Sequence, residues 1–498
     1  MAARPDSTPR RGLPLPLATV ALVVYAAVVV AASMRHEAWY DEAEPWLLAR
    51  DGTLADVFRT TPHAGTPALW FLALMVPAKL GFAIQGMAWV NAAFAIAAIA
   101  VLLWRSPLPR LVTIGFAFGF YAVYEFGVIA RPYALMMMLM FGAAARYASR
   151  IQRPLGYAVL VALLANATAH AVAIAGALVA LYGYEIWRAR TRSTAQRAAL
   201  ILMAGGVLAA AWQLRPQPDA QLGGLAVLRD RYAYRMVGAS LFYFAPWFGG
   251  ILSKASYVLA PLTLVGGVVA LIDRPKALAF LLISLAWLVY VFHFKWYQMP
   301  RHSGLVLLLL LTALWLGSTE PGAFTPGGPR QGLGRVAETA RHATGGLLTI
   351  ALGLSIPVAF HWVRKDWSGP FSESREMADW IRANTRPEEL MVADMFGSTV
   401  LAHLPRDRRM WLAARRDFGS FHTWTQTAID QNVRTWDSVQ IVTDRAAEAF
   451  PRPRPLLVLV INQLPPSIRG YELIHVSPDR RMGYYNEPAR WFLYRRTP

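Results

Sequence analysis

Long apolar runs separated by short polar turns dominate the chain as far as residue 360. The first run, residues 13–33, follows a polar segment that contains Arg4, Arg10 and Arg11. The apolar core of a secretory signal has only about 7–15 residues, so this longer run predicts a retained membrane helix. Spans need roughly 20 apolar residues each, and the pattern predicts about 11 crossings, at 13–33, 85–104, 111–129, 133–147, 157–170, 171–187, 198–212, 257–272, 277–292, 305–316 and 345–360.

The first external loop is predicted to contain helices that lie on the membrane surface. Residues 42–59 have apolar positions at helical spacing with charged residues between them, which is typical of an interfacial helix. Residues 68–80 are apolar but short, and Pro77 and Lys79 interrupt them. If this segment does not cross, the basic clusters between later spans fall on the cytoplasmic side, as the positive-inside rule requires. If the segment crosses, those basic clusters fall on the outer side, against the positive-inside rule. We therefore predict that residues 68–80 form a surface helix.

From residue 364 the long apolar runs end and the composition becomes mixed. The pattern predicts a helix over 372–384 capped by Ser372, buried strands at 390–393 and 456–461, and further strands at 471–476 and 489–494, the last at a sheet edge. The predicted fold class is therefore an α-helical polytopic membrane protein with a C-terminal soluble α/β domain. We expect a transmembrane catalytic module over 1–317, an inner linker with the last transmembrane helix over 318–363, and an external domain over 364–498.

Composition agrees with this architecture. The chain is 56% hydrophobic and 16% charged, which is too apolar for a soluble protein of this size. Its formal charge of +19 comes from basic residues scattered among the spans, so contact with anionic lipid explains it better than nucleic-acid binding. Because the chain has no cysteine, disulfides, thiolate metal sites and cysteine nucleophiles are excluded.

Three polar sets fall on the predicted outer face of the membrane. Carboxylates would there meet basic and aromatic side chains. A carboxylate can take a proton from an acceptor hydroxyl, and arginine or lysine can hold a leaving phosphate. A divalent metal also stays open, because acids and histidines supply suitable ligands, although no spacing requires one. The sets are Asp41, Glu42 and Glu44 with His63; Glu125, Arg131 and Tyr133; and His293, Lys295, Tyr297, Arg301 and His302.

Several of these residues also suit purely structural roles. Arg131 can pair with Glu125 or cap a helix, and Lys295 and Arg301 can reach lipid headgroups with their charged ends. His63 suits a turn as well as a site.

At these residues the chain resembles the GT-C class of membrane glycosyltransferases, which use polyprenyl-phosphate sugars and include protein O-mannosyltransferases and lipid A aminoarabinose transferases. Tyr40-Asp41-Glu42-Ala43 matches the acidic motif of the first external loop, and His63 with Thr66-Pro67-Ala68-Leu69 loosely matches the following element. Ala130-Arg131-Pro132-Tyr133 is similar to an Arg-x-Tyr element, and Arg301 to a late external arginine. Ile129 departs from the pattern, since members often have an acid or glutamine there.

The resemblance implies an inverting glycosyltransferase at the outer face of a bacterial inner membrane, with its C-terminal domain in the periplasm. It would move a hexosyl or pentosyl group from a polyprenyl-phosphate donor to a hydroxyl of a lipid, glycan or protein acceptor. Asp41 and Glu42 would be catalytic, with Asp41 the general base, and no cofactor is certain. Glu44, His63 and Glu125 would orient the acceptor, and the donor phosphate would be bound by Arg131, Tyr133, Lys295, Tyr297, Arg301 and His302.

Two other functions fit parts of the pattern. A transporter or flippase of a lipid-linked saccharide would share the basic and aromatic residues at the surface, but transporters tend to show internal repeats and midplane charges. This sequence shows no repeat, and charges inside its predicted spans are nearly absent. A noncatalytic scaffold would not explain the acidic motif at a membrane exit.

Overall fold

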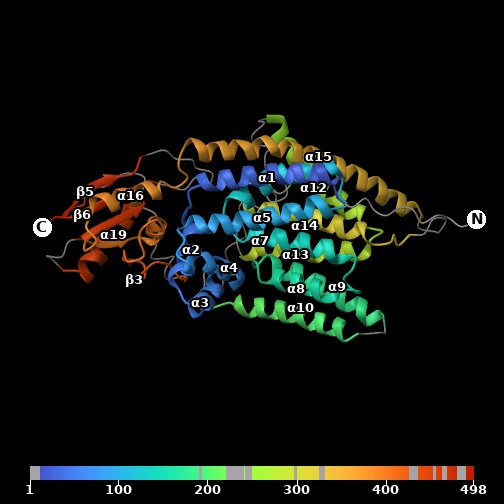
Figure 1. Ribbon diagram of the computed structural model, residues 1–498, viewed down its shortest axis with the longest axis horizontal. Coiled ribbons are helices and arrows are strands. Elements are labelled where there is room, and N and C mark those ends of the chain that lie inside the picture. Colours follow the sequence, from blue (N-terminus) through green and yellow to red (C-terminus); the bar gives the residue numbers. More distant parts are fainter. Residues whose placement is uncertain are drawn as a thin grey trace, which may run out of the picture.

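The computed structural model describes residues 12–189, 193–219, 241, 250–295, 300–324, 331–425, 436–451, 456–461, 468–478 and 490–497. A bundle of long helices forms one part of the molecule, and a small sheet domain lies at one end of it (Figure 1). The short helices α2 (Tyr40–Asp51), α3 (Leu54–Ala64) and α4 (Ala68–Lys79) lie at this end of the bundle, next to the sheet domain.

The bundle helices coincide with the predicted apolar runs. Seven of the described helices are long and apolar enough to cross a membrane, and others, including α8 and α13, are apolar but shorter. The chain is thus a multi-pass membrane protein, and the number of about 11 crossings stays a prediction. The helices are α1 (Leu15–Arg35), α5 (Gln85–Arg105), α6 (Arg110–Phe118) with the π-helix η1 (Tyr121–Val128), α7 (Tyr133–Tyr147), α8 (Pro154–Ala165), α9 (Ala171–Arg188), α10 (Thr194–Gln213), α12 (Gly250–Ala270), α13 (Pro275–Tyr290) with the π-helix η5 (Val291–Lys295), α14 (Pro300–Ser318) and α15 (Gln331–Ser368).

Helix α4 does not run through the bundle. At its start, the backbone N–H of Ala68 donates to the side chain of Gln213 at the end of α10, 2.7 Å away. At its end, the Lys79 ammonium donates to the carbonyls of Arg50 and Gly52, at 3.0 and 2.8 Å. Both ends of α4 therefore stay at the end of the bundle where α2 lies, as expected for a surface helix.

The opposite end of the bundle holds the start of α1. The Gly12 N–H donates to the carbonyl of Ser106, 3.0 Å away, and the Leu13 N–H to that of Leu103 at 2.9 Å. The start of α1 and the turn after α5 therefore lie at the same end of the bundle, away from Asp41. The positive-inside rule predicts that this end is cytoplasmic.

A single cysteine in this cysteine-free chain tests that orientation. Pro109 is exposed in the turn after α5, and Asp379 is exposed in the sheet domain. In intact cells we expect Pro109→Cys to resist a membrane-impermeant maleimide and Asp379→Cys to react with it. Permeabilised cells, in which both should react, provide the control. Labelling of Pro109→Cys in intact cells would reverse the orientation.

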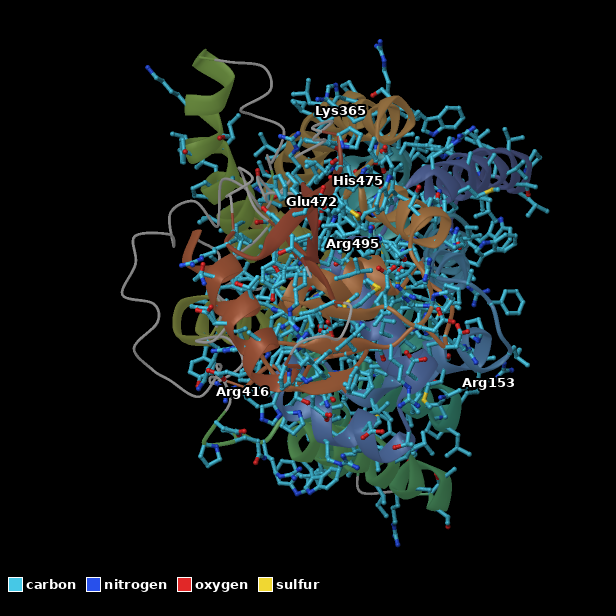
Figure 2. All side chains as sticks on the ribbon, turned by 90° about the vertical axis from the view of Figure 1, so that its left-hand side faces the viewer. Arg153, Lys365, Arg416, Glu472, His475 and Arg495 are labelled. Carbon is cyan, nitrogen blue, oxygen red and sulfur yellow. The ribbon has the colours of Figure 1, made fainter. Side chains whose placement is uncertain are left out.

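The sheet domain has six strands in the order β3-β2-β1-β4-β6-β5. The central strand β1 pairs in parallel with β2 and β4, whereas β6 pairs antiparallel with both β4 and β5. Figure 2 looks onto this domain and shows exposed charged side chains such as Arg416 and Glu472. The strands are β1 (Leu390–Ala393), β2 (Met410–Leu412), β3 (Asp417–Gly419), β4 (Leu456–Ile461), β5 (Tyr471–Val476) and β6 (Trp491–Arg496).

Several details of this domain differ from the sequence prediction. Strand β6 lies between β4 and β5, so the prediction that it forms a sheet edge is wrong. Its residues Trp491 to Tyr494 are all buried, because alternate side chains pack into a hydrophobic cluster on each face of the sheet. Strands β2 and β3 were not predicted, since each has only three residues and shows no periodic pattern.

The junction between α15 and the sheet domain is fastened to the segment just before α2. Helix α16 (Ser374–Asn384) begins two residues later than predicted. The buried Glu37 carboxylate accepts the N–H groups of Glu373 and Arg375 at 3.2 and 2.6 Å, and so caps the start of this helix. The Ser372 hydroxyl, the predicted cap, accepts the N–H of Ser374 at 3.4 Å and donates to the carbonyl of Ala38, 2.9 Å away. The sheet domain is therefore fixed against the start of α2.

Candidate active site

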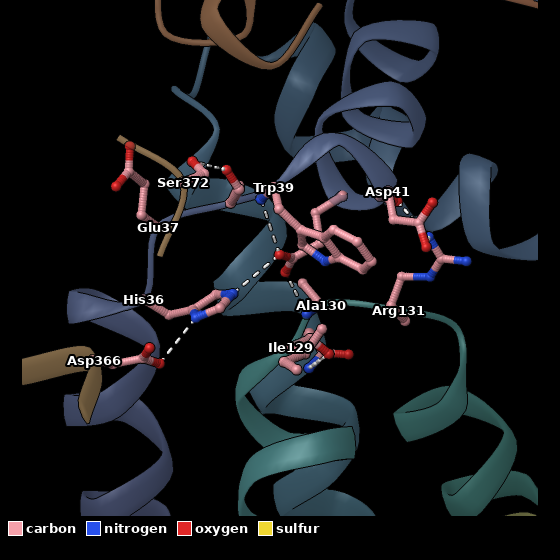
Figure 3. Close-up of polar contacts among 12 residues, drawn as sticks. His36, Glu37, Trp39, Asp41, Ile129, Ala130, Arg131, Asp366 and Ser372 are labelled. Atoms are coloured by element: carbon pink, nitrogen blue, oxygen red, sulfur yellow. Dashed lines mark hydrogen bonds and ion pairs between the residues drawn. The ribbon is translucent and has the colours of Figure 1, made fainter. Parts of the chain in front are cut away.

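The two neighbouring acids at the start of α2 point in different directions. On a helix, consecutive side chains diverge by about 100°. Asp41 faces a cavity, whereas the Glu42 carboxylate turns into the protein and is buried. Figure 3 shows Asp41 with Arg131 on one side of Trp39 and His36 with Asp366 on the other. The divergence separates the two acids into a cavity-facing group and a buried group.

Asp41 is shared by two arginines from distant parts of the chain. Its Oδ2 lies 3.0 Å from Arg131 Nη1 and 2.9 Å from Arg301 Nη2. Arg131 Nη1 also donates to the Asp41 carbonyl, 2.6 Å away. The Arg301 guanidinium lies over the Trp39 ring, 5.6 Å from its centroid, which is cation–π geometry. The predicted first, second and third polar sets thus meet at one carboxylate.

The Glu42 carboxylate is saturated with protein contacts. Its Oε1 accepts the N–H of Ala130 at 2.6 Å, and its Oε2 accepts the N–H of Trp39 at 3.3 Å. The same Oε2 lies 3.0 Å from His36 Nε2 (Figure 3). Because Ala130 directly precedes Arg131, Glu42 fixes the backbone that carries one of the two arginines. Glu42 therefore lies where it can position the backbone next to Arg131.

His36 joins Glu42 to the long helix α15. Its Nδ1 lies 2.9 Å from Asp366 Oδ2, and the Tyr124 hydroxyl donates to Asp366 Oδ1 at 3.1 Å. Burial alone would lower the pKa of the His36 imidazole, but the carboxylates of Glu42 and Asp366 outweigh it and raise that pKa to about 10. His36 therefore holds a proton at neutral pH and balances the negative charge of its two neighbours.

The backbone before Arg131 is held from a second side by Asn91 of α5. Its amide Nδ2 lies 2.9 Å from the carbonyl oxygen of Phe126, 3.0 Å from that of Gly127 and 3.3 Å from that of Ile129. These carbonyls end the π-helix η1, where the helical hydrogen-bond ladder stops. π-Helical segments are frequent at functional sites, and here the segment directs Arg131 toward Asp41.

The cavity beside Asp41 has a volume of about 810 Å³, within the usual range for small-molecule sites. Glu42 and Glu125 do not contribute to its lining, and Glu125 is buried in η1. Tyr297 lies outside the described residues. The other predicted site residues all line the cavity, and they are Asp41, Glu44, His63, Arg131, Tyr133, Lys295, Arg301 and His302.

The basic end of the cavity is built on stacked rings. The ring centroid of His302 lies 4.9 Å from that of His170 and 6.0 Å from that of Tyr133. These rings surround the start of α14, from which Arg301 extends to Asp41. Lys295 lines the same cavity from η5. The cations at this end of the cavity thus lie next to packed aromatic rings.

Glu44 lines another part of the cavity, where the sheet domain contributes to the wall. The N–H of His422 donates to Glu44 Oε2 at 2.8 Å. Burial raises the pKa of the Glu44 carboxyl to about 7, although the His422 N–H, Ser398 and Arg415 partly oppose this. His63 lies 3.1 Å from Asp219 and joins the wall from the end of α3. The predicted acceptor-orienting residues Glu44 and His63 thus share a cavity with Asp41.

Within the part of the chain that the structure describes, no group of three or more His, Asp or Glu side chains could hold a metal ion. Asp41 is instead surrounded by guanidinium groups.

Several residues of the site could not have been identified from the sequence. His36 directly follows an apolar run, and Asn91 is an isolated polar residue within one, so neither belongs to a recognisable motif. Asp366 and His422 belong to segments that showed no motif. The position of Asn91 inside a predicted span was the one usable signal, because polar groups inside membranes are costly unless satisfied.

No protein-family model matches the chain, and no curated protein sequence matches it either. Among solved structures, the chain is similar to ArnT from Cupriavidus metallidurans bound to undecaprenyl phosphate, with a TM-score of 0.53 and 13% identity over 96% of this chain and 97% of ArnT. The apo state of that ArnT gives a TM-score of 0.52 at 12% identity over 96% and 98% of the two chains. The chain has a GT-C fold.

The resemblance to the GT-C class is thereby confirmed at the level of the fold, across the bundle and the sheet domain together. Arabinofuranosyltransferase AftD from Mycobacteria is also similar, with a TM-score of 0.46 and 15% identity over 99% of this chain and 41% of AftD.

Proposed function

We propose that this protein transfers a sugar, with inversion, from a polyprenyl-phosphate donor to an acceptor hydroxyl at the outer face of a bacterial inner membrane. The observation that carries the proposal is the shared contact of Arg131 and Arg301 with Asp41 in one cavity. One acid next to several cations suits a reaction in which the acceptor loses a proton and the donor releases a phosphate.

The proposed reaction uses these groups in defined roles. The acceptor oxygen attacks the anomeric carbon, and Asp41 takes the proton of the attacking hydroxyl. The bond between the anomeric carbon and the phosphate oxygen breaks, and its electron pair leaves with the polyprenyl phosphate. Arg131, Lys295 and Arg301 stabilise the negative charge that develops there. Tyr133 and His302 support these cations, and a divalent metal is not needed for charge balance.

The contact between Asp41 and the arginines is compatible with phosphate binding. A guanidinium has five N–H donors, so one arginine can serve a carboxylate and a phosphate together. Bringing a phosphate to these groups also weakens their hold on Asp41, because both anions compete for the same positive charge. We therefore expect donor binding to loosen the ion pairs of Asp41 with the two arginines.

The donor class is supported by the structural likeness to an ArnT that binds undecaprenyl phosphate. The cavity also has an apolar side suited to a polyprenyl chain, lined by Ala211 and Leu214 at the end of α10 and by Trp287 and Val291 on α13 and η5. We infer that the lipid enters between these helices.

Binding of undecaprenyl phosphate to Arg301 variants tests the donor site. Losing a charge-assisted hydrogen bond costs about 1.5–3 kcal/mol, or roughly ten- to hundredfold in affinity. We expect Arg301→Gln to lower the affinity by this factor in microscale thermophoresis with purified protein in detergent. Arg382→Gln is the matched control, because Arg382 is exposed in the sheet domain, pairs with Asp379 and does not line the cavity. Equal affinity in the wild type and Arg301→Gln would remove Arg301 from the phosphate site.

A further inference from the structure

The sheet domain contributes side chains to the wall of the cavity. His422 and Trp424 line it together with Tyr40 and Glu44 of α2. His422 is tied to Glu44 through its backbone N–H, although the two residues are 378 positions apart in the sequence. The Tyr40 ring lies 6.4 Å from the Trp424 ring at 47°. Two segments from opposite ends of the chain therefore form one surface.

Three buried polar atoms of this surface, on His422 and Glu44, are not hydrogen-bonded within the described part of the protein. Among the described residues, neither ring nitrogen of the buried His422 has a hydrogen-bond partner, and Glu44 Oε1 has none. Buried polar groups are costly unless they are hydrogen-bonded. Burial lowers the pKa of the His422 ring to about 3, so the ring is neutral and offers one donor and one acceptor. A ligand that both donates and accepts hydrogen bonds would satisfy these atoms.

The chemistry of this surface differs from that of the basic end. The cations that line the cavity, Arg131, Lys295 and Arg301, gather around Asp41 and η5, and the described side chains of the sheet domain that line it are an imidazole and an indole. Tyr40 and Trp424 are only partly buried and present aromatic surface to the cavity. An uncharged ring with hydroxyl groups on its rim and C–H groups on its face satisfies both features, and this describes a sugar.

We propose that Tyr40, Glu44, His422 and Trp424 form an acceptor subsite that binds the terminal sugar of a glycan, with Trp424 against the ring face and His422 and Glu44 at its hydroxyls. This inference rests on the proposed function, because it identifies the acceptor of the same cavity. A seryl or threonyl peptide fits less well. The sheet domain itself covers this side of the cavity, which leaves room for the end of a chain of sugars more readily than for a folded protein.

Saturation-transfer NMR on the purified protein in detergent tests the subsite, because it detects weak ligands. The probes are methyl glycosides of mannose, glucose, galactose and arabinose, compared with an acetylated, amidated Ala-Ser-Ala peptide and its threonine equivalent. We expect at least one glycoside to bind, with the strongest transfer to C–H groups on one ring face. Trp424→Leu should lower the affinity at least about tenfold, the effect typical of a central aromatic contact.

His422→Phe provides a second variant that should keep the fold. The hydrogen bond to Glu44 comes from the backbone of His422, so only the ring nitrogens are lost, and we again expect weaker glycoside binding. Trp380→Leu is the matched control. Trp380 is partly buried in the same domain, stacks on His475 with ring centroids 4.4 Å apart and does not line the cavity.

The outcomes separate this inference from the proposed function. Absence of glycoside binding, binding unchanged in Trp424→Leu and His422→Phe, or preference for the peptides would each overturn the sugar subsite. Undecaprenyl phosphate binding measured on the same samples reports the donor site alone. If the lipid binds through Arg301 while glycosides fail, the proposed transferase stands and its acceptor is of another class. If glycosides bind and the lipid does not, the subsite stands and the proposed donor is wrong.

Discussion

Asp41→Asn is expected to lower the rate of sugar transfer by about 10²–10⁴-fold, the usual loss when a general base is removed. Asparagine keeps the shape of the side chain and can still accept a hydrogen bond from Arg301 or Arg131, so the geometry of the cavity should survive. What disappears is the basic oxygen that takes the acceptor proton. The measurement is transfer from radiolabelled polyprenyl-phosphate sugar into the glycolipid and glycan fraction of membranes.

Measuring donor binding to Asp41→Asn shows whether the variant loses activity through its chemistry or through a damaged structure. Because asparagine removes one anion from two guanidinium groups, undecaprenyl phosphate should bind Asp41→Asn at least as tightly as it binds the wild type. Asp51→Asn is the matched control, since Asp51 ends the same helix, pairs with Arg50 at 2.9 Å and does not line the cavity. Near-wild-type turnover by Asp41→Asn would contradict the role of this residue and favour a transporter of lipid-linked saccharides.

The fold could be predicted because apolar runs and charge placement report directly on membrane helices. The surface position of residues 68–80 followed from the arginines of later turns, and the hydrogen bonds at both ends of α4 agree with it. The short strands β2 and β3 could not be predicted, since three residues carry no periodic signal. The inner position of β6 depends on its pairing with β5, which strand composition alone does not determine.

The site could be predicted in its residue types but not in its connections. Asp41 and Glu42 were both predicted to be catalytic, but adjacent positions on a helix diverge, and the start of α2 turns the two side chains apart. The sequence did not reveal that His36 and two backbone N–H groups occupy the Glu42 carboxylate. The contact with Ala130 joins segments far apart in the chain. The sheet domain showed no motif, so neither His422 nor Trp424 was expected at the cavity.

The contacts of Glu42 determine how the activity of Glu42→Gln should be interpreted. Glutamine at this position can accept only through one oxygen, whereas the carboxylate uses both oxygens for Ala130, Trp39 and His36. Loss of activity in Glu42→Gln would therefore report displacement of Arg131, not a missing base.

His36→Leu is expected to destabilise the protein by about 3–5 kcal/mol, the usual cost of leaving a buried charge without its partner. His36 is the cation between the buried carboxylates of Glu42 and Asp366 (Figure 3). Leucine fills much of the space but leaves two like charges facing each other across an apolar group. The damage should reach the site, because Glu42 holds the backbone of Ala130 next to Arg131.

Thermal unfolding of the purified protein in detergent measures this effect, and a double-mutant cycle identifies its cause. If the cost comes from unpaired charge, adding Asp366→Leu to His36→Leu should restore part of the lost stability. His342→Leu is the control, since His342 is exposed on α15 and hydrogen-bonds to the Glu338 carbonyl of its own helix.

The pH dependence gives the last test of the His36 assignment. The pKa of His36 is raised from 6.5 to about 10 on folding, so its contribution is complete below about pH 6.5 and is lost as the pH rises through about 10. The difference in unfolding temperature between wild type and His36→Leu should therefore be largest at pH 6 and shrink steadily toward pH 10. A difference that stays constant over this range would mean that His36 contributes by packing and not by charge, and would remove the buried imidazolium from the support of Glu42 and Arg131.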